Sequence, residues 1–549
     1  MNRLPQEIYD HIGTLLQGPD LNLPALATIS RQWQAAIERR TFGSIYLRSN
    51  DLDCFNEVVR NRRRLYVQEI KYLIVLPTYG DEERGRFERE HDRQANDEAF
   101  TVAIHRLFCL LQSWDISTVG TLWLSIEDVY SPSDHPFLRF SSSRYDGVRR
   151  GGMEIREGED SAVTELWDWR YRYSFIRLLR PSTLPVVPVV SGLRTDVTTR
   201  NLCDRVPIEI ASRLPSLRCG RWSMNYWSIR YLALRRTHRR DLAQAVAELL
   251  PQSSALEELS FQMPPCRDYW DYQNFSSGTL HPENVHRDTL SDAIRTATAH
   301  ISTLRRVFVS GEVDKSLLWP GPTRALLEPY WQGLEYLEIT FSSRRPSGGH
   351  YFEDAKNPTP EEVLPSDGEV PPGYHQSEEE EAEAASFFSA ESEWFPAMEI
   401  DGLEWQPVDE VVPDDDSIGP LIEAFGQACL QMPMLKSAEL MTFVPAPTGF
   451  APNPGPMCGQ SPWGISYFSP RTTAHNAPFR DPAFSEDICK RRLIWDVKDW
   501  RPNTHLQRLF GKIGREKHGE EVVEKFIDSW KSVGKDLSLQ LVASITRPY

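Results

Sequence analysis

The run Leu334-Glu-Tyr-Leu-Glu-Ile339 has the form L-x-x-L-x-I, and Leu256-Glu-Glu-Leu-Ser-Phe261 and Leu304-Arg-Arg-Val-Phe-Val309 repeat it. Apolar residues at alternate positions predict a short strand with one buried face. Amphipathic helical stretches precede these runs, as residues 288–302 precede Leu304. Because helices and strands alternate along the chain, the pattern predicts an α/β fold with one mostly parallel sheet and helices on its convex side.

Similar runs occur at residues 42–47, 69–76, 119–126, 217–222 and 435–440. A helix followed by L-x-x-L-x-L resembles a leucine-rich repeat, in which stacked strands line a curved sheet. The spacing is irregular, because 48 residues separate Leu256 from Leu304 and 30 separate Leu304 from Leu334. Regular repeats take roughly 20 to 29 residues. The resemblance implies an irregular leucine-rich-repeat-like α/β solenoid, and a non-repetitive α/β domain is the alternative.

The amino-terminal segment predicts three short helices. Residues 4–16 read Leu-Pro-Gln-Glu-Ile-Tyr-Asp-His-Ile-Gly-Thr-Leu-Leu, and the two isoleucines and last two leucines form one helical stripe. Pro5 is compatible with a helix start. A second helical stretch begins near Asn22, and Trp33 and Ile37 continue its apolar face. A unit of about 40 residues is near the lower limit for independent folding, so it needs a partner or the next domain.

This segment resembles an F-box, the small helical module that binds a Skp-type adaptor in cullin-RING ubiquitin ligases. The matching elements are Leu4-Pro5-x-Glu7-Ile8, Asp20-Leu21 and Leu26-x-x-Ile29-Ser30-Arg31-x-Trp33, ending at Phe42. The resemblance implies adaptor contacts through Leu4, Pro5, Ile8, Ile12 and Ile29, and assigns Trp33 to packing within the module. An ordinary helical cap on the following domain is the alternative.

The acidic excess of the chain lies in one stretch. The formal net charge is −17, yet residues 361–416 hold 19 Asp or Glu and no Lys or Arg, so the remainder has a net charge of +2. Prolines flank this stretch, and Glu378 to Glu381 form a continuous acidic run. Self-repulsion and proline predict a disordered insertion, with residues 346–392 dispensable for folding. An acidic tether or partner motif is the functional alternative to a solvated linker.

The carboxyl-terminal region has a different pattern. Residues 463–468 and 492–497 alternate apolar and polar positions and predict two strands. Residues 506–530 are predicted to be mostly helical, as a cap over the last strand of the array. The predicted domains are therefore an F-box at 1–48, a repeat-like region at 49–345, an acidic insertion at 346–417, and a last repeat with a cap at 418–549.

Catalytic and cofactor motifs are absent from the sequence. The eight cysteines form no CxxC pair, the thirteen histidines form no HExxH, and no GxSxG or nucleotide-binding glycine loop occurs. The sequence therefore predicts a non-catalytic protein with no metal and no cofactor. An aromatic segment after residues 256–261 is instead a candidate substrate-binding rim, because exposed Tyr and Trp are frequent binding hot spots. It contains Tyr269, Trp270, Tyr272 and Phe275, and a loop folded on the neighbouring unit is the alternative.

The composition of the chain argues against some classes of binding partner. Acidic charge argues against binding to nucleic acid by bulk attraction to phosphate, and no window has the roughly 18 consecutive apolar residues of a membrane helix. With no apolar signal region at the start of the chain, we expect a soluble protein of the cytoplasm or nucleus. The resemblance implies a substrate-recognition subunit of an SCF-type ubiquitin ligase, which binds a Skp-type adaptor, through it cullin, and a target protein. The alternatives are a scaffold that binds the adaptor without delivering substrates and an undetected enzyme in the α/β region.

Overall fold

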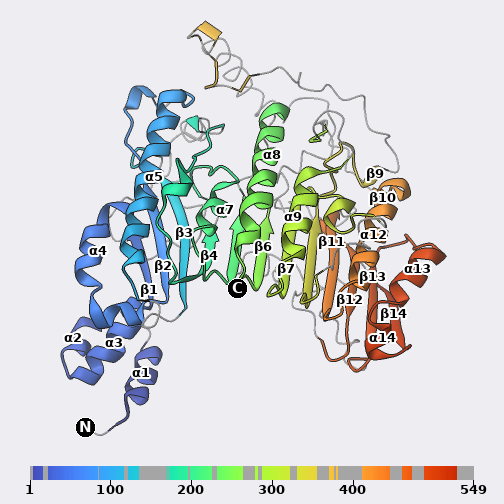
Figure 1. Cartoon of the computed structure of the whole chain (residues 1–549), viewed down its shortest axis with the longest axis horizontal. Coiled ribbons are helices and arrows are strands. Elements are labelled where there is room, and N and C mark those ends of the chain that lie inside the picture. The colour runs from blue at the N-terminus through green and yellow to red at the C-terminus, as the bar shows by residue number, and fades with distance from the viewer. Residues whose placement is uncertain are drawn as a thin grey trace, which may run out of the picture. The chain divides into compact units, whose positions relative to one another are not determined.

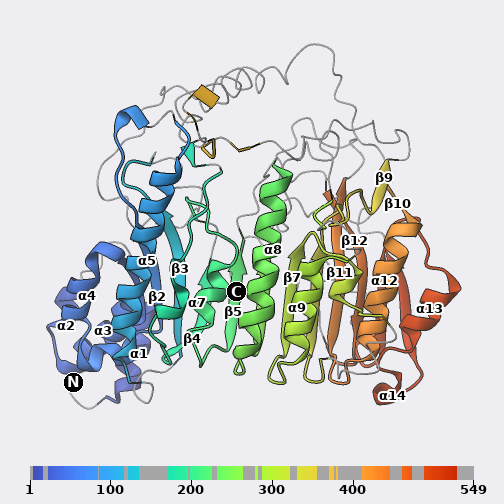
Figure 2. The same cartoon turned by 45° about the horizontal axis from the view of Figure 1, so that its top comes forward.

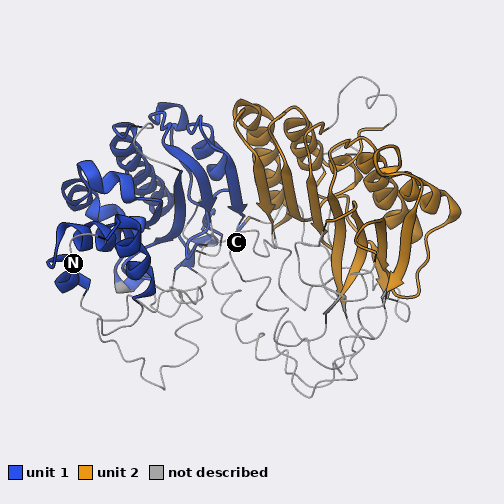
Figure 3. Ribbon diagram, turned by 90° about the horizontal axis from the view of Figure 1, so that it is seen from below, with its two compact units in different colours: residues 1–225, 371–385 blue, residues 226–370, 386–549 orange. Residues whose placement is uncertain are grey.

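In a computed structural model of the chain, parallel strands and helices alternate along most of the sequence. The structure describes residues 4–16, 23–83, 86–115, 121–134, 170–171, 173–195, 198–224, 231–263, 279–281, 287–321, 331–354, 370–371, 373–375, 377, 379–380, 411–445, 460–472 and 487–527. The chain divides into two compact units, residues 1–225 with 371–385 and residues 226–370 with 386–549 (Figure 3). Each unit is a mixed α/β structure with a mostly parallel sheet.

The first unit contains a sheet in which every strand is parallel to the next one along the chain, in the order β1-β2-β3-β4-β5 (Figure 1). Its strands are β1 (Ser44–Arg48), β2 (Glu69–Val75), β3 (Leu122–Tyr130), β4 (Val190–Thr195) and β5 (Cys219–Ser223). Its helices are α1 (Gln6–Leu15), α2 (Leu23–Ala27), α3 (Arg31–Gly43), α4 (Leu52–Val58), α5 (Glu90–Gln112) and α7 (Val206–Ala211), with 3-10 turns that include η2 (Asn61–Tyr66).

The core of the first unit lies between the sheet and helix α5 (Figure 2). Ile70, Tyr72 and Ile74 alternate along β2 and are fully buried, because side chains at every second position of a strand share a face. The Tyr72 hydroxyl donates a hydrogen bond to the Ala103 carbonyl of α5 at 2.9 Å. On α5 the buried apolar residues recur at helical spacing, at Phe100, Ile104, Leu107, Phe108 and Leu111. The buried face of β2 and the buried face of α5 thus pack against each other in one core.

The second unit contains a sheet in the order β6-β7-β8-β11-β12-β13-β14. Its strands are β6 (Glu258–Gln262), β7 (Arg306–Gly311), β8 (Tyr336–Phe341), β11 (Ser437–Pro445), β12 (Gln460–Phe468), β13 (Arg491–Asp496) and β14 (Val522–Ile527). Its helices are α8 (Leu232–Leu249), α9 (Thr289–Ala299), α12 (Asp415–Leu430), α13 (Thr504–Gly511) and α14 (Arg515–His518), and they lie on one face of the sheet (Figure 3). Strands β6, β7, β8 and β11 are parallel, and β12 is antiparallel to both of its neighbours.

The expected strand runs all form strands, and β1 to β3, β5 to β8 and β11 each pair in parallel with a neighbour in their own unit. Strand β4 was not among the runs expected from the sequence. Val190 and Leu193 on β4 are fully buried. Gly192 and the polar residues around it interrupt the alternation of apolar and polar side chains, so the sequence does not indicate a strand here. Burial against the neighbouring strands stabilises it instead.

The predicted helix at 506–530 is wrong in its second half. Helix α13 ends at Gly511, and residues 522–527 form strand β14, paired in parallel with β13. The Trp495 ring of β13 stacks on the Phe526 ring with 6.0 Å between centroids. Val, Phe and Ile in this segment suit a strand as well as a helix, and the open edge of β13 decides between them. Strands β12, β13 and β14 therefore extend the sheet past β11.

The acidic insertion begins later in the chain than predicted. Strand β9 (Phe352–Asp354) pairs antiparallel with β10 (Val411–Pro413), and the side chains of Tyr351 and Phe352 are buried. The Tyr351 hydroxyl donates to the Val313 carbonyl at 2.9 Å. These aromatic residues hold 346–354 on the second unit. Most of the remaining segment expected to be disordered, 355–392, lies outside the described residues.

Candidate interaction site

Helix α1 packs on α3 through a face that its own apolar pattern did not indicate. The Tyr9 ring of α1 meets the Trp33 ring of α3 edge-to-face, with 5.4 Å between centroids and 80° between planes. One turn later, Gly13 lies against Ala36, and both are buried. Ser30 caps α3 by accepting a hydrogen bond from the Trp33 amide at 3.2 Å. The inward face of α1 is thus Tyr9 and Gly13.

Because Tyr9 and Gly13 face α3, the isoleucine and leucine stripe of α1 is left largely uncovered. The exposed fractions are 52% for Leu4, 43% for Ile8 and 66% for Leu15, and Pro5 is exposed as well. Ile12 is half-buried, and Ile29, in the turn before α3, is 61% exposed. Large apolar side chains gathered on one small module are a feature of interaction surfaces.

Polar contacts hold the helices of this module together and attach the module to the next segment, η2. Asp10 of α1 is ion-paired with Arg39 of α3, and Gln6 Nε2 donates to the Gln32 carbonyl at 3.1 Å. Glu38 of α3 is ion-paired with Arg63 of η2 at 2.8 Å. Burial alone would raise the pKa of Glu38, but the hydrogen bonds from Arg63 and Gln34 outweigh it and lower that pKa. The apolar residues are therefore presented on an anchored support.

The structure describes all five predicted adaptor contacts, and most of them are exposed. Leu4, Pro5, Ile8 and Ile29 are exposed and Ile12 is half-buried, while Trp33 packs inside the module. The predicted substrate-binding aromatics Tyr269, Trp270, Tyr272 and Phe275 lie outside the described residues. The exposed set, Leu4, Pro5, Ile8, Leu15 and Ile29, is called the apolar patch below.

The face of the first sheet opposite α5 carries a row of polar and charged side chains. Strand register aligns Tyr46, Lys71, Ser125, Arg194 and Arg221 across five strands. Lys71 Nζ donates to the Tyr46 hydroxyl at 3.2 Å, and Arg194 Nε donates to the Ser125 hydroxyl at 3.1 Å. Tyr46 is exposed, Lys71, Arg194 and Arg221 are half-buried, and Ser125 is fully buried.

Acidic residues and a tryptophan complete this face. Arg194 is ion-paired with Glu127 at 2.8 Å and with Glu69 at 3.4 Å. The Arg221 guanidinium lies 5.4 Å from the centre of the Trp123 ring, which itself covers Gly192. Arg and Trp are the residue types that most often carry binding energy at protein interfaces.

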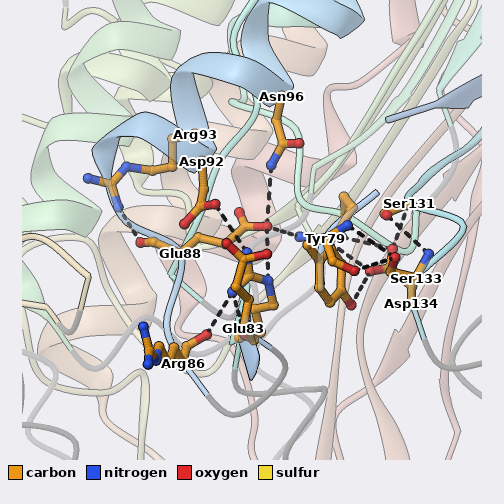
Figure 4. A network of polar contacts seen from close by, with 12 residues as sticks. Tyr79, Glu83, Arg86, Glu88, Asp92, Arg93, Asn96, Ser131, Ser133 and Asp134 are labelled. Carbon is orange, nitrogen blue, oxygen red and sulfur yellow. Dashed lines mark hydrogen bonds and ion pairs between the residues drawn. The ribbon is translucent and has the colours of Figure 1, made fainter. Parts of the chain in front are cut away.

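A buried charge network lies near the carboxyl ends of strands β2, β3 and β4 (Figure 4). Arg200 donates two hydrogen bonds to Asp134, at 2.9 Å from Nε and 2.7 Å from an Nη atom, and is also ion-paired with Glu88. The Tyr79 hydroxyl donates to Asp134 at 2.9 Å. Arg170 donates to Asp92 at 3.2 Å and lies over the Tyr79 ring at 4.3 Å.

The charges of this network satisfy one another. Burial alone would lower the pKa of Arg200, but Glu88 and Asp134 outweigh it and raise that pKa. Burial, with the Asp134 charge second, raises the pKa of Tyr79. A general acid or base needs a pKa near the working pH, and these groups move away from it. The network therefore joins the loops after three strands to the start of α5. It escaped sequence reasoning because its members lie up to 121 residues apart, Tyr79 to Arg200.

One cluster of possible metal ligands occurs among the described residues, formed by Glu83, His91 and Asp92. The Asp92 oxygens already accept from the Arg89 amide at 3.0 Å and from Arg170 at 3.2 Å. Glu83 accepts from the Gly80 amide at 2.8 Å. These carboxylates serve as helix and turn caps, so this cluster is not a candidate metal centre.

Comparison with protein-family models finds no match to this chain, and comparison with curated proteins finds none either. In the described part of the chain, every helix is too short or too polar to cross a membrane.

Proposed function

We propose that the chain is a substrate-recognition subunit of an SCF-type ubiquitin ligase. In this proposal the apolar patch binds a Skp-type adaptor, which connects it to cullin, and the repeat-like α/β region binds a target protein. The chain carries out no chemistry of its own and contributes proximity and orientation. The observation that carries the proposal is the exposure of Ile8 and Leu15 on a helix that packs through other residues, and of Leu4 just before that helix.

Covering the apolar patch with a partner would be energetically favourable, because it removes apolar side chains from water. Exposed leucine and isoleucine side chains gain roughly 1.5–3 kcal/mol each when fully buried by a partner. A helix that docks in a groove does so through a few apolar anchors spaced by whole turns, as Ile8 and Leu15 are. Selection for solubility alone would favour polar residues at these positions, so a covering partner accounts for them.

The target-binding part of the proposal rests on the sheet. Leucine-rich-repeat-like arrays present the helix-free face of their strands to partners. On the first unit that face holds the Trp123 and Arg221 pair and the Lys71 and Arg194 charges. Its mixture of cations and carboxylates favours a polar protein surface as the target. The aromatic segment at 269–275 stays a predicted second contact.

The proposal is tested by titrating a recombinant Skp-type adaptor against the full chain and against the variant Leu4→Ala/Ile8→Ala. Loss of each good anchor costs about 1–2 kcal/mol, so the double variant should bind at least about thirtyfold more weakly. The matched control is Val102→Ala/Val186→Ala, which removes two exposed apolar side chains of the first unit outside the module. This control should bind within about twofold of the parent chain.

Three outcomes would count against the proposal. No binding by the parent chain removes the adaptor altogether, and equal weakening by the control variant means that contact is non-specific. Adaptor binding without cullin recruitment in a reconstituted mixture would leave a scaffold in place of a ligase subunit. Circular dichroism of each variant establishes that it is folded.

A further inference from the structure

A pocket of about 420 Å³ lies in the second unit, at the edge of the sheet where β8, β11 and β13 begin and β12 ends. Its walls come from three places: the residues that lead into β8 and β11, the turn after β12, and helix α14. The lining residues are Tyr336, Leu435, Lys436, Ser469, Pro470, Arg471, Thr472, Lys517 and His518. None of them is acidic, and three carry a permanent positive charge.

The cations of this pocket are weakly neutralised. Lys436 is paired with Glu335 at 2.6 Å, but Glu335 does not line the pocket. Within the described part of the chain, the polar partner of Lys517 Nζ is the Pro433 carbonyl, at 3.3 Å. Among the described residues, no acceptor contacts the Arg471 guanidinium. An anion in the pocket would therefore meet at least two cations that have no carboxylate partner in the described chain.

Two buried arginines build the walls behind the pocket. Arg492 donates to the Ser469 carbonyl at 3.4 Å and to the Thr472 carbonyl, which holds the turn after β12. Arg491 donates to the Ile513 carbonyl at 2.6 Å and to the Glu520 carbonyl at 2.8 Å, which holds the two ends of α14. Burial lowers the pKa of both arginines. Both guanidinium groups thus bond to backbone carbonyls and hold in place the turn and the helix that line the pocket.

The turn itself is conformationally unusual. Arg471 has a left-handed backbone with φ of 62°, which costs a non-glycine residue of order 1 kcal/mol or more. The Ser469 and Thr472 hydroxyls lie 2.8 Å apart in the same turn, so one hydrogen of the pair is free to point elsewhere. Cations from three segments and a hydroxyl pair surround the space from several directions. A tetrahedral phosphate, with three terminal oxygens, uses such an arrangement better than a planar carboxylate.

We propose that this pocket binds a small phosphorylated anion, held by Arg471, Lys517 and Lys436 with the hydroxyls of Ser469 and Thr472. The proposal does not depend on the adaptor-binding function, because the apolar patch belongs to the other unit. The volume is in the range of small-molecule sites and accommodates a phosphate group with a compact organic part.

The test is a calorimetric titration of the full chain with pyrophosphate and with glycerol 2-phosphate, at low salt. Saturable one-to-one binding with a Kd below about 1 mM is expected, a ceiling that corresponds to about −4 kcal/mol. The variant Arg471→Gln/Lys517→Gln should bind at least tenfold more weakly. The matched control Arg508→Gln/Lys512→Gln removes two exposed charges from the nearby α13 region without touching the pocket, and should bind within twofold of the parent.

Several results would overturn the proposal. These are the absence of saturable binding, equal weakening in the control variant, and equal effects of chloride at matched ionic strength. Binding of a phosphoserine peptide by a chain that ignores both small phosphates would also overturn it, in favour of a protein ligand. If the double variant does not fold, Lys517→Gln alone serves, because that exposed side chain has one carbonyl contact.

Discussion

The Tyr9 and Trp33 rings meet edge-to-face at 5.4 Å, and this contact sets which side of α1 faces inward. With Tyr9 turned towards α3, Ile8 on the neighbouring side of the helix is turned outward. Adjacent helical residues point about 100° apart, so a single packed aromatic determines the exposure of the whole stripe. This ring pair therefore contributes both to the stability of the module and to the exposure of its apolar patch.

Replacing Tyr9 by Ala should release α1 from α3. The change removes a buried aromatic side chain and an edge-to-face contact, which together contribute about 2–4 kcal/mol. Amide exchange of residues 6–15 should accelerate by at least tenfold, while exchange in the sheet of the first unit stays unchanged. His11→Ala, on the exposed side of the same helix, is the control and should leave exchange near the parent rate. Unchanged exchange in Tyr9→Ala would mean that α1 is held by other contacts.

Replacing Arg200 by Ala should destabilise the first unit strongly. Glu88 and Asp134 would remain buried without their shared cation, and breaking a buried ion pair in this way costs about 3–5 kcal/mol. Denaturant unfolding followed by amide exchange in residues 75–79 measures the effect. Arg106→Ala removes an exposed pair with Asp53 and should cost less than about 1 kcal/mol. Similar losses in the two variants would contradict a special role for the network.

Replacing Glu439 by Gln should change how stability depends on pH. Burial, with the charge of Glu338 directly opposite on β8 as a second cause, raises the pKa of Glu439 to about 8. A carboxyl whose pKa is raised on folding stabilises fully below its unfolded pKa, and that stability is lost as pH rises to about 8.

The measurement is the melting temperature of the parent chain and of Glu439→Gln from pH 5 to pH 9. Between about pH 5 and about pH 8, the free energy of unfolding of the parent should fall by up to about 1.4 kcal/mol per pH unit, whereas that of the variant should not. The two should be close at pH 5, with the variant more stable at pH 8 and above. Parallel curves across this range would show that Glu439 is ionised or solvated in the folded protein.

Replacing Gly192 by Ala should disturb the face of the first sheet that carries Trp123. A Cβ atom at this position would overlap the indole ring of Trp123, so the ring must move or the strands must separate. Overpacking of this kind costs about 1–3 kcal/mol. Gly43→Ala is the control, since an added Cβ there meets no atom within 4 Å. Thermal unfolding should show a loss only for Gly192→Ala; equal stability would mean that Trp123 repacks freely.

The α/β alternation could be predicted because it is local. Runs such as 334–339 alternate with period two, and their helices repeat every three to four residues, so each element carries its own signal. The amino-terminal helices were predictable for the same reason. At residues 522–527 the local pattern fits a helix or a strand, and pairing with β13 settles the matter. That pairing joins segments far apart in the chain, and no local pattern encodes it.

The candidate sites divide in the same way. The apolar residues of the patch are visible in the sequence, but their exposure follows from the packing of Tyr9 and Gly13 on α3. The Arg200 network and the cationic pocket gather residues from loops and strand ends that no motif links. The sequence shows how many charged residues there are, whereas an ion pair or a pocket depends on how close those residues lie in the folded chain.

By itself, the sequence determined the types of the regularly patterned elements, the apolar stripe of α1 and the acidic stretch at 361–416, because periodicity and composition act over a few residues. Only the tertiary structure decided which face of α1 is free, that residues 522–527 are a strand, and that Arg471 and Lys517 share a pocket. The physical reason is that these outcomes depend on which surfaces are buried against each other, and burial is a property of the folded chain.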